Sequence, residues 1–282
     1  MIVYPEIIAV REYCRNLRHS GKKIGFVPTM GYLHEGHLSL VRVAKAETDA
    51  VAVSIYVNPM QFGPNEDLQK YPRDLERDLA LLEKVETDLV FVPSEEMMNS
   101  PPSDIRVVPH ALSQTLCGKF RPGHFEGVVT VVTKLFNIIQ PQRAYFGQKD
   151  AQQCIIIQQL VKDLNFDIEI VVCPIIREND GLAKSSRNVY LSSQERQEAP
   201  VLYQALQLGE KMIREGEKKR DKIIGRMKEM VYHLPTCTRV DYIEVVDAET
   251  LQPLVEIKGK ILIALAVYIG KTRLIDNSVV TI

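Results

Sequence analysis

Short apolar runs alternate with amphipathic stretches through the first part of the chain. The apolar runs are rich in β-branched and aromatic residues and predict strands at 24–27, 51–57, 89–92, 144–146 and 168–172. The stretches between them have apolar residues at helical spacing and predict helices at 38–47, 71–85, 126–139 and 150–163. Because the strands are apolar on both faces, the alternation predicts an α/β fold, a parallel sheet covered by helices on each side.

The pattern changes after Pro174. Two helices with Lys- and Glu-rich outer faces are expected at 193–217 and 221–233. Three strand-like runs follow at 240–246, 260–269 and 273–282. Helices followed by antiparallel strands predict a separate, smaller α+β domain. We place the boundary near Ile176, which gives domains of residues 1–176 and 177–282.

Composition narrows the class of protein. A chain of 282 residues with 45% hydrophobic and 25% charged residues is typical of a soluble globular protein. The net charge of -1 argues against a nucleic-acid partner bound through a broad basic surface. No apolar run approaches the roughly 20 residues that a membrane span needs. Five scattered cysteines without a Cys-x-x-Cys pair, and an N-terminus without an export signal, predict a cytoplasmic protein with reduced thiols.

The segment from Pro28 to His37 carries the strongest chemical signal. It joins a predicted buried strand to a predicted helix, and it places His34 and His37 at the helix start. A helix N-terminus presents unpaired amide donors and partial positive charge, which suit an anion, and Gly36 allows close approach of a phosphate. Imidazoles three residues apart lie on the same side of a helical turn. The segment therefore predicts a phosphate site; a loop with two solvated histidines is the alternative.

Two weaker segments lie at 56–63 and 121–132. In the first, Asn58 and Gln61 follow a strand and suit directed hydrogen bonds to a polar substrate, although a structural turn explains them equally well. In the second, Arg121 and His124 lie in a glycine-containing turn that leads into a helix. A well-formed turn with a cation near a helix start is the alternative there.

Two further segments suit phosphate chemistry. Lys149 follows a strand and a glycine, and its compact positive charge can bridge phosphate oxygens. Asp150 either caps the next helix or binds a ribose hydroxyl, and Gln153 lies one turn further on the same side as Lys149. The loop at 177–188 contains Ser185, Ser186 and Arg187, which suit a mobile clamp on terminal phosphates. No Gly-x-x-x-x-Gly-Lys-Ser/Thr loop and no Gly-x-Gly-x-x-Gly motif is present.

Together and in this order, the five segments resemble the pantothenate synthetase (pantoate–β-alanine ligase) family over essentially the whole chain. The motifs are Pro-Thr-Met-Gly-x-Leu-His-x-Gly-His, Asn-Pro-x-Gln-Phe, Gly-His-Phe-x-Gly-Val, Phe-Gly-x-Lys-Asp and Asp-Gly-Leu-Ala-x-Ser-Ser-Arg-Asn. The first and last are this family's versions of the His-x-Gly-His and Lys-Met-Ser-Lys-Ser signatures of nucleotidyltransferases. Lys184 is a departure, because the family usually carries an apolar residue at this position.

The resemblance implies a Rossmann-like ATP- and pantoate-binding domain, a C-terminal lid domain and a two-step ligation. The carboxylate of pantoate attacks the α-phosphorus of ATP and gives pantoyl adenylate and pyrophosphate. The amine of β-alanine then attacks the acyl carbon and gives pantothenate and AMP. Such a reaction needs positive charge and hydrogen-bond donors aimed at the charge that develops on the phosphates, and no covalent enzyme nucleophile.

The resemblance also implies roles for individual residues. His34 and His37 are expected on the phosphates, with His37 as proton donor or leaving-group stabiliser, and Lys149 on the α-phosphate. Ser185, Ser186 and Arg187 are expected on the β- and γ-phosphates. The remaining ATP-binding residues are expected to be Met30, Gly31, Tyr32, Leu33, Glu35, Gly36, Gly147, Gln148, Asp150 (ribose), Ile176 and Lys184.

Gln61 and Gln153 are expected to bind pantoate, and Gln61 later to orient β-alanine. Mg²⁺ is expected on the polyphosphate, with Asp78 as a candidate protein ligand, and the family is typically a homodimer.

Two other classes of protein remain open. One is a nucleotidyltransferase with a phosphorylated acceptor, and the other is a non-catalytic ATP sensor in which Lys184 disrupts the nucleotide site.

Overall fold

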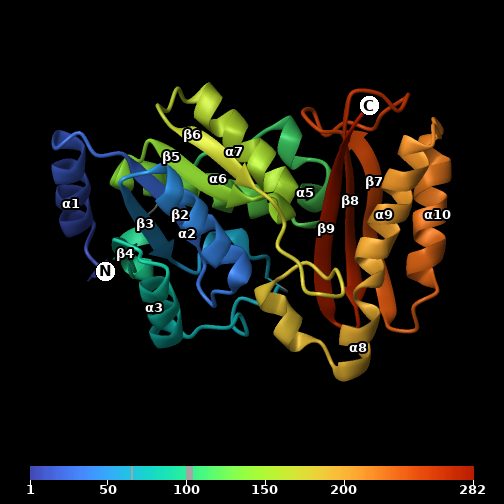
Figure 1. Ribbon diagram of the computed structural model, residues 1–282, viewed down its shortest axis with the longest axis horizontal. Helices are drawn as coiled ribbons and strands as arrows, with labels where there is room; N and C mark the ends of the chain where they lie inside the picture. The colour runs from blue at the N-terminus through green and yellow to red at the C-terminus, as the bar shows by residue number, and fades with distance from the viewer. Residues whose placement is uncertain (65, 100–103) are drawn as a thin grey trace. The chain divides into compact units, whose positions relative to one another are not determined.

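The chain folds into two units, each built around its own sheet (Figure 1). The computed structural model describes residues 1–64, 66–99 and 104–282. The first unit comprises Met1–His110, Arg121–Gly147 and Gln153–Pro174, and the second comprises Ala111–Phe120, Gln148–Gln152 and Ile175–Ile282. Two short segments that precede Ile176 in the sequence, at 111–120 and 148–152, therefore group with the second unit.

The sheet of the first unit is parallel throughout, as the sequence predicts. Its strands lie in the order β1-β4-β3-β2-β5-β6. They are β1 (Ile2–Tyr4), β2 (Ile24–Thr29), β3 (Ala50–Ile55), β4 (Leu89–Phe91), β5 (Arg143–Gly147) and β6 (Glu169–Cys173). The central strand β2 has β3 on one side and β5 on the other, so the segments that follow these three strands leave the sheet at the same edge.

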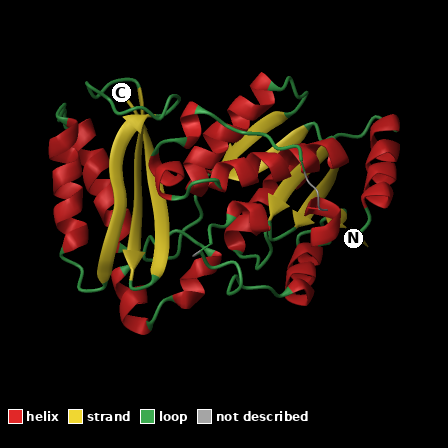
Figure 2. Cartoon of the chain, turned by 180° about the vertical axis from the view of Figure 1, so that it is seen from behind, coloured by secondary structure: helices red, strands yellow, loops and turns green. Residues whose placement is uncertain are grey.

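Helices cover both faces of this sheet, because successive strand residues point in opposite directions. Val27 packs in one apolar cluster with Val41 of α2, whereas Phe26 meets Phe136 of α6 edge-on, with ring centroids 6.3 Å apart. Figure 1 shows α2 over one face, and Figure 2 shows helices crossing the strands from behind. The helices are α1 (Ile7–His19), α2 (Glu35–Glu47), α3 (Leu75–Lys84), α4 (Glu95–Asn99), α6 (His124–Ile139) and α7 (Ala151–Asp163), with the 3-10 turn η1 (Pro59–Gln61).

The second unit contains an antiparallel sheet in the order β7-β8-β9. Its strands are β7 (Cys237–Asp247), β8 (Lys260–Ile269) and β9 (Thr272–Thr281). Its helices are α5 (Leu116–Phe120), α8 (Ser193–Glu198), α9 (Val201–Arg214) and α10 (Arg220–Tyr232). Three 3-10 turns complete it, namely η2 (Ala111–Ser113), η3 (Gln148–Asp150) and η4 (Ser186–Tyr190).

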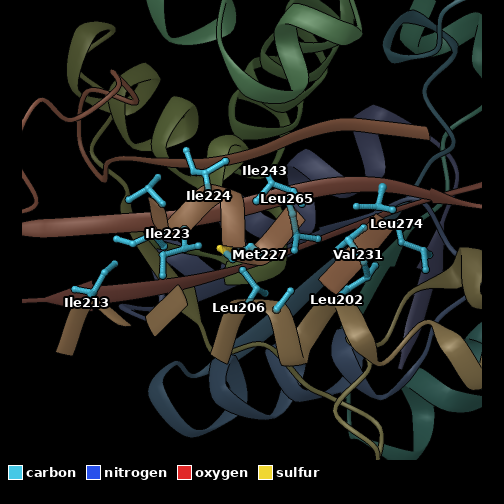
Figure 3. Packing of buried hydrophobic residues seen from close by; sticks show 14 of the residues in the cluster. Leu202, Leu206, Ile213, Ile223, Ile224, Met227, Val231, Ile243, Leu265 and Leu274 are labelled. Carbon is cyan, nitrogen blue, oxygen red and sulfur yellow. The ribbon is translucent and has the colours of Figure 1, made fainter. Parts of the chain in front are cut away.

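The core of this unit lies between the sheet and helices α9 and α10. Figure 3 shows Leu206 of α9 and Met227 of α10 packed toward Ile243 and Leu265 of the strands. The neighbouring strand residue Tyr242 points to the other face, where its ring lies 6.0 Å from that of Phe120. The segment at 111–120 therefore packs against the face of the sheet opposite helices α9 and α10.

Three local differences from the sequence-based expectations have physical causes. The helix expected at 193–217 is divided into α8 and α9, because Pro200 forms the N-cap of α9 and cannot continue a helix. Helix α1 was not predicted; among its residues only Val10 and Cys14 are buried, so its apolar face is short. Strand β1 has three residues on the edge of the sheet. Within the described ranges, no helix has the length and apolar character needed to span a bilayer.

Candidate active site

The loop that follows β2 is held in a defined conformation by its own backbone and by one buried carboxylate. Gly31 and Tyr32 both have positive φ, at 79° and 48°, so the chain turns sharply and directs N–H groups inward. The carboxylate of Asp78, in α3, accepts the Tyr32 N–H at 2.6 Å and the Leu33 N–H at 2.7 Å. Asp78 is only 1% exposed. This carboxylate satisfies two amides that would otherwise lie buried without partners.

Arg77 reinforces the same contact from the neighbouring position in α3. Its guanidinium donates to the carbonyl of Leu33 at 3.0 Å and lies 5.0 Å from the centroid of the Tyr32 ring. A Cβ at Gly31 would approach Asp78 Oδ2 and Ile55 Cγ2 to 3.0 Å, so the loop has little room for a side chain there. The start of α3 therefore fixes the backbone that leads to the two histidines.

His34 and His37 lie at the N-terminus of α2 and face one another, with ring centroids 4.1 Å apart. His34 is the N-cap, and its Nδ1 accepts the Gly36 N–H at 3.1 Å, while His37 Nδ1 accepts the His34 N–H at 3.3 Å. A ring nitrogen that accepts an amide carries no proton, so a neutral ring in this geometry has its proton on Nε2. Both imidazoles are thereby oriented as Nε2 donors at a helix N-terminus, where partial positive charge favours an anion.

Gln61, at the end of η1, is 9% exposed and lies beside the same loop. Its Nε2 lies 2.8 Å from Sδ of Met30, and its Oε1 accepts from Asn58 Nδ2 at 3.3 Å. Asn58 also donates to the carbonyl of Gly127 at 3.0 Å and so joins η1 to α6. A Cβ at Gly127 would lie 2.4 Å from the carbonyl oxygen of Met60, which explains the glycine at this position.

Arg121 and His124 hold the backbone of Gln61. His124 Nδ1 donates to the Gln61 carbonyl at 2.8 Å, and Arg121 Nη2 donates to the same oxygen at 3.3 Å. The Arg121 guanidinium also pairs with Glu66, with Nε 2.8 Å from Oε1. Burial raises the pKa of Glu66, but the hydrogen bonds and charge of Arg121, together with the His124 ring and the Gly63 amide, outweigh it and hold the pKa below its usual range. The segment at 121–124 thus supports Gln61, a connection that the sequence pattern did not reveal.

In the second unit, the segment that contains Lys149 forms η3 and packs against β9. Asn277 of β9 donates to the carbonyls of Gln148 and Lys149, both at 2.9 Å. The ammonium of Lys149 lies 3.8 Å from the Asp150 carboxylate, whose side chain is 48% exposed. Gln152, which is buried, accepts the Cys117 N–H at 2.9 Å and donates to the carbonyls of Leu112 and Thr115. These contacts tie residues 148–152 to the C-terminal unit.

The loop with the two serines and the arginine lies in the same unit. Arg177 and Ala183 form a bridge, and Lys184 N donates to the carbonyl of Ile176 at 2.9 Å, so a short hairpin leads to Ser185. Ser185 caps η4 by accepting the Arg187 N–H at 3.3 Å. The ammonium of Lys184 lies 2.8 Å from the carboxylate of Glu178. The unusual cation at position 184 is thus already paired within the loop.

The structure distributes the expected site residues between the two units. His34, His37, Gln61, Gly147 and Gln153 lie in the first, whereas the second contains Gln148, Lys149, Asp150, Ile176, Lys184, Ser185, Ser186 and Arg187. Within the first unit, His34, His37, Met30 and Gln61 are joined through the loop that follows β2. Within the second unit, η3 and η4 both pack against β9. Glu35, expected near ATP, directs its carboxylate to Arg42.

Asp78 does not suit the role of a Mg²⁺ ligand that the sequence suggested. Each of its oxygens accepts a short backbone hydrogen bond, and the side chain is almost completely buried. Among the residues that the structure describes, no group of three or more His, Cys, Asp or Glu side chains suits a metal ion. Asp78 supports the loop instead.

The chain thus contains a parallel α/β unit with a His-x-Gly-His loop at a strand end and an antiparallel unit with a Ser-Ser-Arg loop. The model of the pantoate-beta-alanine ligase family matches residues 2–279. The chain belongs to this family and is an enzyme of the pantoate-β-alanine ligase type.

Individual relatives agree along the whole chain. Pantothenate synthetase from Caldicellulosiruptor bescii is 56% identical over 282 residues, which cover 99% of each chain. The crystal structure of pantothenate synthetase from Thermus thermophilus is 44% identical, with a TM-score of 0.93 and 99% of each chain covered. Pantoate-beta-alanine ligase from Francisella tularensis, complexed with beta-gamma ATP and β-alanine, is 38% identical, with a TM-score of 0.81 over 99% of this chain and 97% of that one.

Proposed function

We propose that this enzyme joins (R)-pantoate to β-alanine in two steps, through a pantoyl-adenylate intermediate, and releases pyrophosphate, AMP and pantothenate. The observation that carries the proposal is the pair of imidazoles at the N-terminus of α2, held 4.1 Å apart on a loop fixed by Asp78. Such a pair suits an anion in which negative charge grows during the reaction.

In the first step, a carboxylate oxygen of pantoate forms a bond to the α-phosphorus, and the bond from that phosphorus to the bridging oxygen of pyrophosphate breaks. We assign His34 and His37 to the phosphates, with His37 stabilising the leaving pyrophosphate through Nε2. Lys149 brings the α-phosphate and the pantoate oxygen together by offsetting their charges. Ser185, Ser186 and Arg187 hold the β- and γ-phosphates. Because the attacking group is the substrate carboxylate, no enzyme nucleophile takes part.

In the second step, the amine of β-alanine attacks the acyl carbon, AMP leaves and the ammonium proton is lost to solvent. Gln61 and Gln153 are assigned to pantoate, and Gln61 then orients β-alanine. The Asn58, Arg121 and His124 contacts that immobilise Gln61 support this role. Asp150 is assigned to the ribose, and the backbone near Gly147 and Ile176 to the adenine nucleoside.

ATP and β-alanine are supported as substrates by the complex of the Francisella relative, whose overall structure is similar. We expect Mg²⁺ to arrive bound to the polyphosphate, where it offsets charge that His, Lys and Arg side chains leave uncompensated. The remaining residues of the proposed ATP site are Gly31, Tyr32, Leu33, Gly36, Gln148 and Lys184. Since the ammonium of Lys184 pairs with Glu178, we expect it to contribute through its backbone and alkyl stem. We also propose that the enzyme is a homodimer, as the family resemblance implies, and that it is cytoplasmic, as its scattered cysteines suggest.

The test is AMP formation by the purified enzyme with ATP, pantoate and β-alanine. We expect AMP only when all three are present, and His37→Ala and Lys149→Ala to slow pyrophosphate release by at least about a hundredfold. AMP formation without pantoate would favour another acceptor. Nucleotide binding without any turnover would favour an ATP sensor. Unchanged pyrophosphate release in either variant would refute the role given to that residue.

A further inference from the structure

Two segments of the proposed ATP site pack against the same edge strand of the second unit. Strand β9 is the outer strand of its sheet, and both η3, with Lys149, and η4, with Arg187, lie against it. Asp276 and Asn277 are adjacent in β9 and only 4% and 3% exposed. Polar side chains buried this deeply require hydrogen-bond partners, so their partners indicate what the two residues do.

The carboxamide of Asn277 is fully engaged with the segment that contains Lys149. Its Nδ2 donates to the carbonyls of Gln148 and Lys149 at 2.9 Å each, and its Oδ1 accepts from Gln148 Nε2 at 3.0 Å. These two carbonyls belong to the peptide planes on either side of the Lys149 Cα. Because each peptide is planar, fixing both planes fixes φ and ψ of Lys149. The direction in which its side chain leaves the backbone is then set by Asn277.

Asp276 acts on the opposite face of the strand, as alternation along a strand requires. Its carboxylate accepts two hydrogen bonds from Arg177, with Nη1 at 2.6 Å and Nη2 at 3.0 Å. Arg177 also donates to the carbonyl of Gly181 at 3.0 Å, and its guanidinium lies 3.9 Å from the centroid of the Tyr203 ring. The first residue and the turn of the hairpin that leads to Ser185 are therefore anchored to Asp276.

The two adjacent residues are also joined to one another, because the Asn277 N–H donates to Asp276 Oδ1 at 2.8 Å. Burial raises the pKa of Asp276, while the positive charges of Arg177 and Lys149 act in the opposite direction. Two adjacent residues of β9 thus contact both proposed phosphate-binding segments. Asn277 binds the backbone of the segment that contains Lys149, and Asp276 binds Arg177 of the hairpin that leads to Ser185.

We propose that Asp276 and Asn277 are positioning residues of the ligation reaction: Asn277 sets the direction of Lys149, and Asp276 sets the approach of Ser185 and Arg187. This inference rests on the proposed function, because it requires Lys149 and Arg187 to contact the phosphates. Neither positioning residue touches substrate. Their contribution is to hold the cations in place before ATP binds, which lowers the cost of ordering them in the transition state.

The sharpest test is Asn277→Asp, measured by pantoate-dependent exchange of pyrophosphate into ATP. The substitution keeps the shape but replaces two donors with an acceptor that faces two carbonyls. We expect the maximal exchange rate at pH 8 to fall about thirtyfold, with the KM for pantoate unchanged. A carboxyl buried against carbonyls has a raised pKa. At lower pH this carboxyl gains a proton and again donates one hydrogen bond to a carbonyl. The exchange rate of the Asn277→Asp enzyme relative to the parent enzyme therefore rises.

Three further variants complete the design. Asn277→Ala loses the same donors and does not titrate, so it is expected to be slow without recovery at low pH. Asp276→Asn is expected to raise the KM for ATP about fivefold while kcat falls less than threefold, because it loosens the β- and γ-phosphate clamp. Ser278→Ala is the matched control: it removes the next side-chain hydrogen bond of β9, to Glu210, and we expect no change in rate.

The outcomes separate this inference from the proposed function. The positioning role of Asn277 is supported if Asn277→Asp exchanges pyrophosphate slowly at pH 8 and its rate recovers at low pH. An exchange rate within twofold of the parent enzyme, or a slow rate that does not recover at low pH, overturns that role. If Lys149→Ala is slow in the same assay while Asn277→Asp is not, this inference alone fails. If Lys149→Ala exchanges normally, the role proposed for Lys149 fails first. Should the Asn277 variants not fold, as judged by thermal melting, the KM and kcat split of Asp276→Asn decides.

Discussion

Two loops of the proposed site are held by side chains of opposite hydrogen-bonding character. The loop after β2 turns through positive φ and presents backbone N–H groups, which the carboxylate of Asp78 accepts. The segment at 148–149 presents backbone carbonyls, to which the carboxamide of Asn277 donates. A buried loop is therefore fixed by a residue chosen for the backbone groups that the loop leaves unpaired. Asp and Asn are nearly isosteric, yet we expect both Asp78→Asn and Asn277→Asp to disrupt the loop that each residue holds.

Among variants of the residues that support the site, the largest effect is expected for Asp78→Asn. The new amide group opposes one of two backbone N–H donors, so the loop before His34 shifts and one donor loses its partner. We expect the pyrophosphate exchange rate to fall about fiftyfold and the free energy of unfolding to drop by about 1–3 kcal/mol. Glu76→Gln is the control, because it removes the same charge from the exposed first turn of α3. An Asp78→Asn enzyme as fast as the control would show that the clamp does not position the histidines.

A smaller effect is expected for Gln61→Ala, in which the loop stays anchored and a substrate contact is lost. We expect the KM for pantoate to rise about tenfold, with kcat within about threefold, since a lost hydrogen bond to a substrate costs about 0.5–1.5 kcal/mol. Titration of the initial rate with pantoate measures both constants. An unaltered pantoate titration would remove Gln61 from the substrate site and leave its side chain as a structural partner of Met30 and Asn58.

The ion pair between Glu66 and Arg121, which supports Gln61, should make the stability of the protein depend on pH. The pKa of Glu66 is lowered in the folded protein, although burial alone would raise it, because Arg121 donates to the carboxylate. A lowered pKa contributes stability that is present above the unfolded value of about 4.3 and is lost as pH falls through the folded value. We expect Glu66→Gln to lower the free energy of unfolding by about 1 kcal/mol at pH 7 and by less at pH 3.5. Urea unfolding at both pH values measures this, and an equal loss at both would contradict it.

The smallest effect is expected for Lys184→Met, which removes the ammonium and places an apolar side chain at this position. Because Glu178 already pairs with the ammonium, we expect the KM for ATP to change by less than about twofold. Initial rates against ATP concentration measure it. A tenfold rise in KM would show that the charge of Lys184 reaches the nucleotide, and a tenfold fall would show that it impedes binding.

Most strands of the two sheets were predictable from the sequence because they contain buried apolar runs, whereas the short edge strand β1 is largely exposed and was not predicted. The run at 24–27 lies in β2, and the run at 260–269 has the bounds of β8. A strand that is covered on both faces of its sheet needs a continuous apolar run, so the sequence of the strand itself carries the signal. The motif at 28–37 was predictable for the same reason: it follows a strong strand signal, and the expectation that both imidazoles face one side is confirmed by their 4.1 Å separation.

The supporting residues were not predictable, because their partners are remote in sequence. Asp78 binds an amide 46 residues away, and Asn277 binds a carbonyl 129 residues away. Neither pairing leaves a periodic pattern, and an Asp in the first turn of a helix resembles any residue that favours the helix dipole. Asp276 and Asn277, which the sequence analysis did not single out, are adjacent polar residues within β9. Such an interruption signals a buried polar pair, but it does not name the partner.

The most direct measurement is a crystal structure of the enzyme with pantoate and a non-hydrolysable ATP analogue. The account predicts that His37, Lys149 and Arg187 all lie within hydrogen-bond distance of one triphosphate, with the Asp78 and Asn277 contacts intact. A triphosphate that contacts the histidines while Lys149 and Arg187 lie apart from it would contradict the account.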